Sequence, residues 1–112
     1  MAAAFDLFKG QDGQYYWTLF AANNEPILQS EGYQSKQGAE NGIAAVKQAA
    51  PLEKQYVKGG TGPYYFTLKA VGNNEPIGTS EQYSAYAGME KGIASVKANA
   101  PTAPIQNRPG QE

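Results

Sequence analysis

The chain of 112 residues contains neither cysteine nor histidine. The lack of cysteine excludes disulfides, thiolate nucleophiles and cysteine-ligated zinc. The lack of histidine removes the commonest general acid–base near neutral pH, the Ser-His-Asp triad and the main imidazole metal ligand. Few small enzymes lack cysteine and histidine at the same time. The composition therefore favours a protein that is not an enzyme and that has no cofactor and no metal site.

An excess of charge of either sign is also absent. Nine Lys and Arg residues against ten Asp and Glu residues give a net charge of −1. This balance lacks the basic footprint that nucleic acids and anionic lipids require of a partner, so both are disfavoured. No apolar run approaches the roughly 20 residues that span a bilayer, and residues 1–6 do not resemble a secretory signal. We therefore expect cytoplasmic residence and no membrane contact.

What the sequence does contain is a tandem duplication. Residues 23–51 match residues 73–101 at 17 of 29 positions, and residues 5–22 match residues 54–71 at 8 of 18 positions. Agreement at this level does not arise by chance. The chain is therefore two copies of one unit.

The two repeats are predicted to occupy residues 5–53 and 54–103, followed by a C-terminal strand or tail at residues 104–112. At this length the chain can bury a modest core, and the three parts are expected to form one compact domain.

Each unit is predicted to contain three strands followed by one helix. Residues 15–21 alternate between two faces and are rich in aromatic and β-branched side chains, which indicates a strand. Asp12-Gly13 and Asn23-Asn24 are turn signals on either side of it. Ser35 is the predicted N-cap of a helix of about 14 residues.

A three-stranded sheet with one helix leaves an edge and an open face, so one unit cannot close a core. Two units can pair into one larger antiparallel sheet with both helices on one face, and the chain is then an internal pseudo-dimer that we expect to be monomeric. Helix residues Gly38 and Gly42 recur as Gly88 and Gly92. They are expected to let the helix approach the sheet closely, against the ring of Trp17 or its counterpart Phe66.

Four segments of the first copy carry a resemblance to a known family: Tyr15–Leu19, Asn23–Ile27, Ser30–Tyr33 and Ala39–Lys47. With their second copies they resemble the YegP-like family of small uncharacterised bacterial proteins, from residue 5 to about residue 103. The resemblance implies an α+β fold of two tandem β3-α-β repeats that form one antiparallel sheet with two helices packed on one face. It also implies that C-terminal strands are exchanged between units, which occur in tandem or as single-unit homodimers.

The second copy departs from the family pattern at Gln82 and Tyr86, where the first copy has Gly32 and Lys36. Strict two-fold equivalence of the repeats is therefore not expected. The resemblance brings no established activity and no accepted catalytic residues.

The first candidate site is the sheet face that the helices leave uncovered. Six side chains are predicted to point outward there: Tyr16, Thr18, Phe20, Tyr65, Thr67 and Lys69. Exposed aromatics of this kind form protein interfaces or stack on unpaired bases, although they also simply pack on one another across strands. The balanced charge favours a protein or peptide partner over single-stranded nucleic acid.

The second candidate is a repeated Ser-Glu-X-Tyr element, made of Ser30, Glu31 and Tyr33 and of Ser80, Glu81 and Tyr83. Its two glutamates are candidates for an acid–base pair or a metal site across a pseudo-two-fold axis. The interpretation that we favour is structural, because two carboxylates without histidine or further acids make a poor metal site. Three hypotheses remain, in this order: a non-enzymatic binding module, a single-stranded nucleic-acid accessory protein and a carboxylate-based enzyme.

Overall fold

Both halves of the chain fold into three strands followed by a helix, in a computed structural model that describes residues 2–107. The first half contains β1 (Ala4–Lys9), β2 (Tyr15–Phe20), β3 (Pro26–Gln29) and α1 (Lys36–Ala49). The second half contains β4 (Tyr56–Gly59), β5 (Tyr65–Lys69), β6 (Pro76–Thr79) and α2 (Tyr86–Asn99). A 3-10 turn follows each helix, at Glu53–Gln55 and Ala100–Thr102, and β7 (Ile105–Asn107) comes last.

The local signals act as the sequence predicts. Gly13 adopts a φ of 83°, and Asn24 adopts a φ of 69°, so both turns use the left-handed region that these residue types tolerate. Ser35 caps α1, because its side chain accepts a hydrogen bond of 2.9 Å from the backbone N–H of Gly38. Its counterpart, Ala85, has the same extended backbone but makes no side-chain cap bond.

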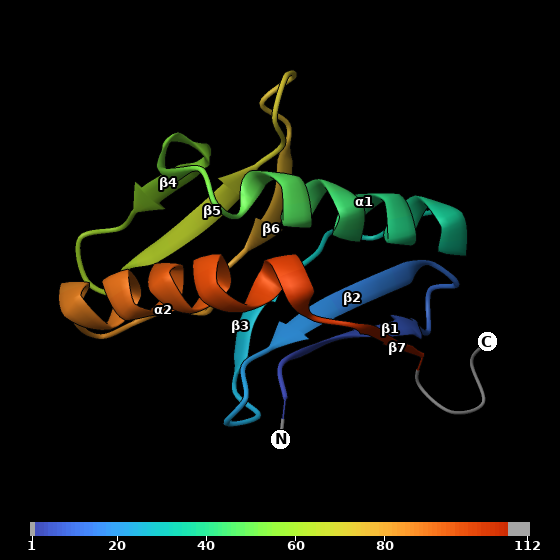
Figure 1. Cartoon of the computed structure of the whole chain (residues 1–112), viewed down its shortest axis with the longest axis horizontal. Coiled ribbons are helices and arrows are strands. Elements are labelled where there is room, and N and C mark those ends of the chain that lie inside the picture. Colours follow the sequence, from blue (N-terminus) through green and yellow to red (C-terminus); the bar gives the residue numbers. More distant parts are fainter. Residues whose placement is uncertain (1, 108–112) are drawn as a thin grey trace.

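The strands form one seven-stranded sheet in the order β4-β5-β6-β3-β2-β1-β7 (Figure 1). The two halves meet at β3 and β6, which run antiparallel with Gln29 opposite Thr79. The pseudo-two-fold axis therefore passes between these two central strands. The predicted α+β fold, with one sheet and two helices, is confirmed.

One pairing differs from the expected antiparallel sheet. β7 lies parallel to β1, with Phe5 opposite Ile105 and Leu7 opposite Asn107. The backbone N–H of Phe5 donates to the carbonyl of Pro104 at 2.8 Å, which fixes the entry of the strand. The returning chain therefore runs beside β1 in the same direction, and the last strand of the second repeat extends the sheet of the first. Residues 108–112 of the predicted tail lie outside the described residues.

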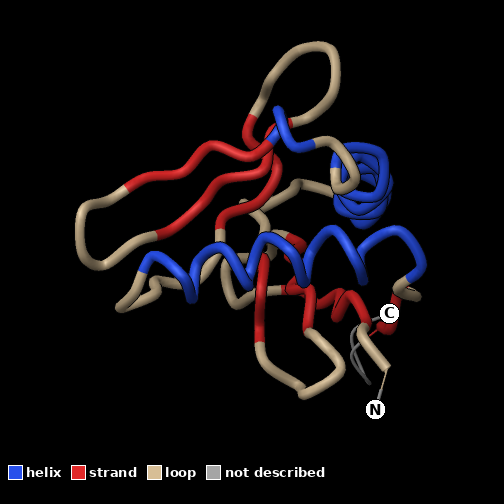
Figure 2. The backbone as a smooth tube through the Cα atoms, turned by 60° about the vertical axis from the view of Figure 1, so that its left-hand side comes forward, coloured by secondary structure: helices blue, strands red, loops and turns tan. Residues whose placement is uncertain are grey.

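Both helices pack on one face of the sheet, and each touches both halves. α1 contacts β2 of its own repeat and β5 and β6 of the other, while α2 contacts β3 and β5. Figure 2 looks almost along α1 while α2 runs across the view, so the helices cross over the junction of the halves. No helix within residues 2–107 is long and apolar enough to cross a membrane.

The core is asymmetric at the junction. Trp17, Leu28 and Phe66 are fully buried there. The counterpart of Leu28 is Gly78, and a Cβ placed on Gly78 would lie 2.8 Å from Leu28 Cγ and 3.1 Å from Trp17 Cη2. The larger side chains of the first repeat therefore fill the space that glycine leaves in the second, as close packing of the interior requires.

Candidate functional site

The first copy of the Ser-Glu-X-Tyr element ties strand ends together. The Ser30 hydroxyl accepts a 2.9 Å hydrogen bond from the backbone N–H of Trp17 and donates a 2.8 Å bond to the carbonyl of Glu31. Tyr33 exchanges two backbone hydrogen bonds, of 2.7 and 2.8 Å, with Tyr15. These contacts hold the segment that leads into α1.

The second copy repeats the arrangement. Ser80 accepts from the N–H of Phe66 at 2.9 Å and donates to the carbonyl of Glu81 at 2.7 Å. Tyr83 exchanges backbone bonds of 2.8 and 2.7 Å with Tyr64. The serine and tyrosine of both copies thus carry backbone contacts, while both glutamate side chains are exposed.

The tyrosines of this element lie against the helix glycines. A Cβ on Gly42 would lie 2.7 Å from Tyr33 Cζ and 3.2 Å from Trp17 Nε1. A Cβ on Gly92 would likewise lie 2.8 Å from Tyr83 Cζ. The sequence predicted this close approach against Trp17 and Phe66, whose rings do lie 3.2 Å from the two Cβ positions, but it missed the tyrosines, which lie closer. The constant nine-residue spacing from tyrosine to glycine in both repeats was the available signal.

The structure does not bring Glu31 and Glu81 together. Gln29 and Thr79 face each other across the antiparallel junction. Each glutamate comes two residues later in its own segment, and the two segments run in opposite directions. At about 3.3 Å per residue the backbones of Glu31 and Glu81 are displaced by roughly 13 Å along the strands. The Glu81 carboxylate accepts a hydrogen bond from Gln29 instead. Within residues 2–107 there is no group of three or more His, Cys, Asp or Glu side chains that could hold a metal ion.

The six predicted outward-facing residues share the face opposite the helices, but they do not form one patch. They belong to β2 and β5, which are separated in the sheet by β3 and β6. The intervening strands present Gln29 and Thr79, which pair with Thr18 and Thr67. At about 4.8 Å per strand the two groups are roughly 14 Å apart, with a polar strip between them.

In the first group, Tyr16 already has contacts with other side chains of the same repeat. The Tyr16 hydroxyl donates to Asp12 at 2.5 Å, and the ring stacks on Phe8 with centroids 5.8 Å apart. This hydrogen bond lowers the pKa of Asp12, with help from the backbone N–H of Gln14, and raises the pKa of Tyr16. The ring also covers Gly10, where a Cβ would lie 2.7 Å from Tyr16 Cε1.

In the second group, Tyr65 covers Gly59 in the same way but lacks the other two partners. In the sequence the counterparts of Asp12 and Phe8 are Thr61 and Val57, but the strand registers differ, because Phe8 lies opposite Tyr16 whereas Gly59 lies opposite Tyr65. Tyr65 remains 38% exposed and Val57 45% exposed. The two side chains lie on neighbouring strands, because Gly59 pairs with Tyr65 and Val57 pairs with Thr67. In the first repeat the aromatic pair on this face, Phe8 and Tyr16, is less exposed, and the residue opposite Thr18 is the charged Asp6 instead of a valine.

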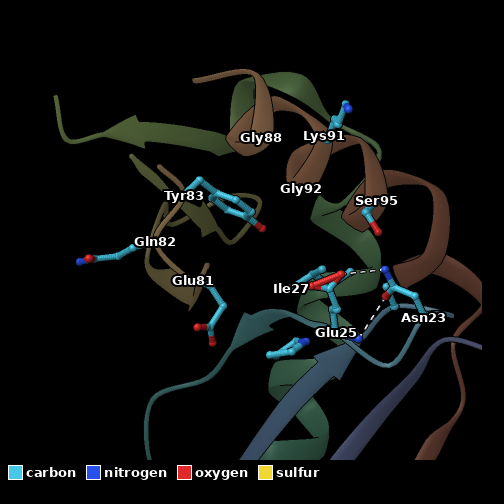
Figure 3. A pocket seen from close by; sticks show the side chains of 12 residues that line it. Asn23, Glu25, Ile27, Glu81, Gln82, Tyr83, Gly88, Lys91, Gly92 and Ser95 are labelled. Carbon is cyan, nitrogen blue, oxygen red and sulfur yellow. Dashed lines mark hydrogen bonds between the residues drawn. The ribbon is translucent and has the colours of Figure 1, made fainter. Parts of the chain in front are cut away.

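A cavity of about 510 Å³ lies between the two repeats (Figure 3). One wall is the turn from β2 to β3, and the other walls are the loop after β6 and one face of α2. Its lining residues are Ala21, Asn23, Glu25, Pro26, Ile27, Glu81, Gln82, Tyr83, Gly88, Lys91, Gly92 and Ser95. Burial raises the pKa of the Tyr83 hydroxyl, and the charges of Glu81 and Glu25 raise it further.

Sequence reasoning did not find this cavity. It treated Asn23-Asn24-Glu25-Pro26-Ile27 as turn chemistry and family signature, although its five identical residues in both copies exceed what a turn needs. Lys91 and Ser95 carried no signal, because their counterparts are Asn41 and Ala45.

A comparison with protein families matches both repeats to one family, described as a domain of unknown function (DUF1508), at residues 11–56 and 61–107. The chain belongs to the DUF1508 family. Curated relatives include the UPF0339 protein YegP of Escherichia coli, which is 47% identical over 72 residues, or 62% of this chain and 66% of the relative. YegP of Yersinia pestis is 48% identical over 68 residues, or 59% of this chain and 61% of the relative. These matches thus span a little under two thirds of the relatives' length.

Two solved structures share the fold. The solution NMR structure of E. coli yegP, described as a protein of unknown function, has a TM-score of 0.91 and 43% identity, and the match covers 100% of this chain and 97% of that one. A UPF0339 protein of Shewanella oneidensis has a TM-score of 0.88 and 40% identity, covering 96% and 92%. The resemblance to YegP-like proteins is thereby confirmed. These relatives are uncharacterised, and no enzyme family is indicated.

Proposed function

We propose that the protein is a non-enzymatic binding module that holds an extended peptide segment of a partner protein at the β4 side of its open sheet face. The observation that carries this proposal is the exposed pair Val57 and Tyr65 beside a strand edge. In the first repeat, the equivalent tyrosine is engaged by Asp12 and Phe8.

β4 is an edge strand, since β5 is its neighbour on one side and no strand in the described sheet follows on the other. Such an edge presents unpaired N–H and C=O groups that an extended peptide can use by adding a strand. The other edge strand, β7, offers fewer backbone groups for pairing with a peptide, because it is three residues long and follows Pro104.

Lysine commonly protects an edge strand from pairing, but Lys58 is drawn away from that role. Its amino group forms a 2.5 Å ion pair with Glu90 and a 3.3 Å hydrogen bond with Tyr86, both on α2. These bonds raise the pKa of Lys58, the bond to Glu90 most, so the residue stays charged and engaged on the helix side. The side chain that β4 directs to the open face is Val57.

The chemistry of this surface describes the peptide. Val57 and Tyr65 favour apolar or aromatic side chains at alternate positions, and Lys69 on the same face favours an acidic residue. Strand addition supplies affinity from the backbone, and these side chains supply selectivity.

Single-stranded nucleic acid suits the face less well. Lys69 is the base that the strands present there, and Asp6 on β1 offsets it with a negative charge. Binders of phosphate backbones present a clustered basic surface instead.

The proposal is tested by selecting heptapeptides from a displayed random library on the purified protein and measuring the enriched peptides by fluorescence anisotropy. We expect Tyr65→Ala to weaken binding by at least about tenfold, as the loss of a central aromatic anchor does. The matched control is Tyr16→Ala, the same change at the equivalent position, which should leave binding unchanged. Thermal melts establish that both variants are folded.

Enrichment of no peptide, or equal losses in the two variants, would contradict the proposal. So would binding of a single-stranded RNA oligomer with a steep salt dependence, which would instead indicate the nucleic-acid alternative.

A further inference from the structure

The cavity between the repeats offers chemistry that the proposed peptide surface does not use. It lies on a different part of the molecule, beside α2 and the β2–β3 turn, and it is assembled from both repeats. Its volume of about 510 Å³ is within the range of small-molecule sites, which are roughly 300–1,000 Å³.

The floor of the cavity is apolar and unobstructed. Ile27 and Ala21 are buried beneath it. On the α2 side, Gly88 and Gly92 present no side chain, so the Tyr83 ring lies directly against the helix. A short apolar body can therefore be covered here.

The two acidic groups beside this floor come from different repeats. Glu25 enters from the first repeat and Glu81 from the second, and the Tyr83 hydroxyl lies between their walls (Figure 3). Each carboxylate is oriented by a neighbour: Asn23 donates to Glu25 at 2.9 Å, and Gln29 donates to Glu81 at 2.5 Å. Each carboxylate keeps acceptor capacity for another partner.

Lys91, which also lines the cavity, does not neutralise the negative charge between Glu25 and Glu81. Figure 3 shows the amino end of Lys91 directed away from the space between Glu25 and Glu81. The Ser95 hydroxyl, in contrast, points toward Asn23 in the same view and adds a neutral polar group, which accepts a 3.1 Å hydrogen bond from Asn99.

We infer that this pocket is a binding site for a small organic cation, a primary amine or amidinium group attached to a short apolar body. The cationic group donates hydrogen bonds to the carboxylates of Glu25 and Glu81, and the apolar body lies over Ile27 beside the Tyr83 ring. Charge-assisted bonds of this kind are about twice as strong as neutral ones. Burial, and after it the charges of Glu81 and Glu25, raise the pKa of Tyr83, so its hydroxyl stays neutral beside the cation.

The other side of the pseudo-two-fold axis provides matched controls within the same chain. The counterparts of Glu81 and Glu25 are Glu31 and Glu75, which do not line this cavity. Over α1, Asn41 and Ala45 replace Lys91 and Ser95, and Gly32 replaces Gln82. The inference therefore concerns one side of the molecule only.

The test is a titration of the ¹⁵N-labelled full chain with butylamine and benzylamine at neutral pH, followed by amide NMR shifts. We expect saturable shifts at Ile27, Tyr83 and Gly92 with a dissociation constant near or below about 1 mM. Glu81→Gln and Glu25→Gln should each weaken binding by about tenfold. Glu31→Gln, the control, should not. Neutral butanol and anionic butyrate should produce no saturable shift.

A further arm compares butylamine with a lysine whose α-amino and α-carboxyl groups are both blocked and whose side-chain amine is free. This comparison distinguishes a free amine from a protein side chain as the source of the cation. Equal binding of butanol or butyrate, an equal loss in Glu31→Gln, or no saturable shift with either amine would overturn the inference. Magnesium producing the same shifts would overturn the assignment to an organic cation.

Discussion

The two repeats have the same backbone plan, and they differ most where they touch each other. At the junction the first repeat contributes Trp17 and Leu28, while the second contributes Phe66 and Gly78. Two copies of the first repeat would bring two leucines into the space that holds one. Two copies of the second would leave that space empty. The duplicated units have thus become complementary halves.

The same divergence occurs on the surface. In the first repeat Asp12 and Phe8 engage Tyr16, whereas in the second repeat Tyr65 remains exposed beside Val57. One copy of the duplicated tyrosine therefore has a packing role, while the other copy remains exposed. The proposed peptide surface lies on the second repeat for this reason.

The largest expected effect comes from breaking the complementarity of the core. Gly78→Leu introduces a side chain whose Cβ would lie 2.8 Å from Leu28 Cγ, so something in the core must shift. We expect a loss of about 3 kcal/mol in the free energy of unfolding, at the upper end of overpacking costs. Urea unfolding followed by Trp17 fluorescence measures it.

The exchange variant, Leu28→Gly with Gly78→Leu, moves the large side chain across the pseudo-two-fold axis. It measures whether positions 28 and 78 are coupled. It should be more stable than the sum of the two single changes predicts, by at least about 1 kcal/mol. Recovery should be incomplete, since Trp17 Cη2 also lies 3.1 Å from the Cβ position at residue 78. Additive losses would mean that the two positions are not coupled.

The features predictable from the sequence are those set by short-range rules or by the repeat itself. The alternation in β2, the left-handed Asn24, the Ser35 cap and the pairing of two units beneath two helices follow from local chemistry and from the need to cover an open sheet. The parallel pairing of β7 with β1 did not follow, because three residues carry no periodicity and either direction satisfies their hydrogen bonds.

The sites were harder to predict, because they depend on positions far apart in the chain. Alternation placed Tyr16 and Tyr65 on one face, but it cannot show that β3 and β6 separate them. The cavity joins Glu25 to Glu81 across 56 residues, and the register at Gln29 and Thr79 that creates it is a tertiary property. Only the repeat of the Asn-Asn-Glu-Pro-Ile segment hinted at a role beyond a turn.

A smaller effect is expected where the second repeat lacks a helix cap. Ala85 has φ −128° and ψ 145°, close to the −138° and 156° of Ser35, so a serine there can form the same bond to the backbone. Ala85→Ser should stabilise the protein by about 1 kcal/mol, and Ser35→Ala should cost about as much. Thermal or urea unfolding compares the two variants. A destabilising Ala85→Ser would mean that the two helix starts are not equivalent.

The central claim is that neither repeat forms a stable core alone and that the two differ so as to complete each other. Its most direct test separates residues 1–53 from residues 54–112 and follows each fragment, and their equimolar mixture, by circular dichroism and sedimentation. We expect each fragment alone to show no cooperative melt and the mixture to fold as a one-to-one complex. A cooperatively melting monomer of residues 1–53 would contradict it.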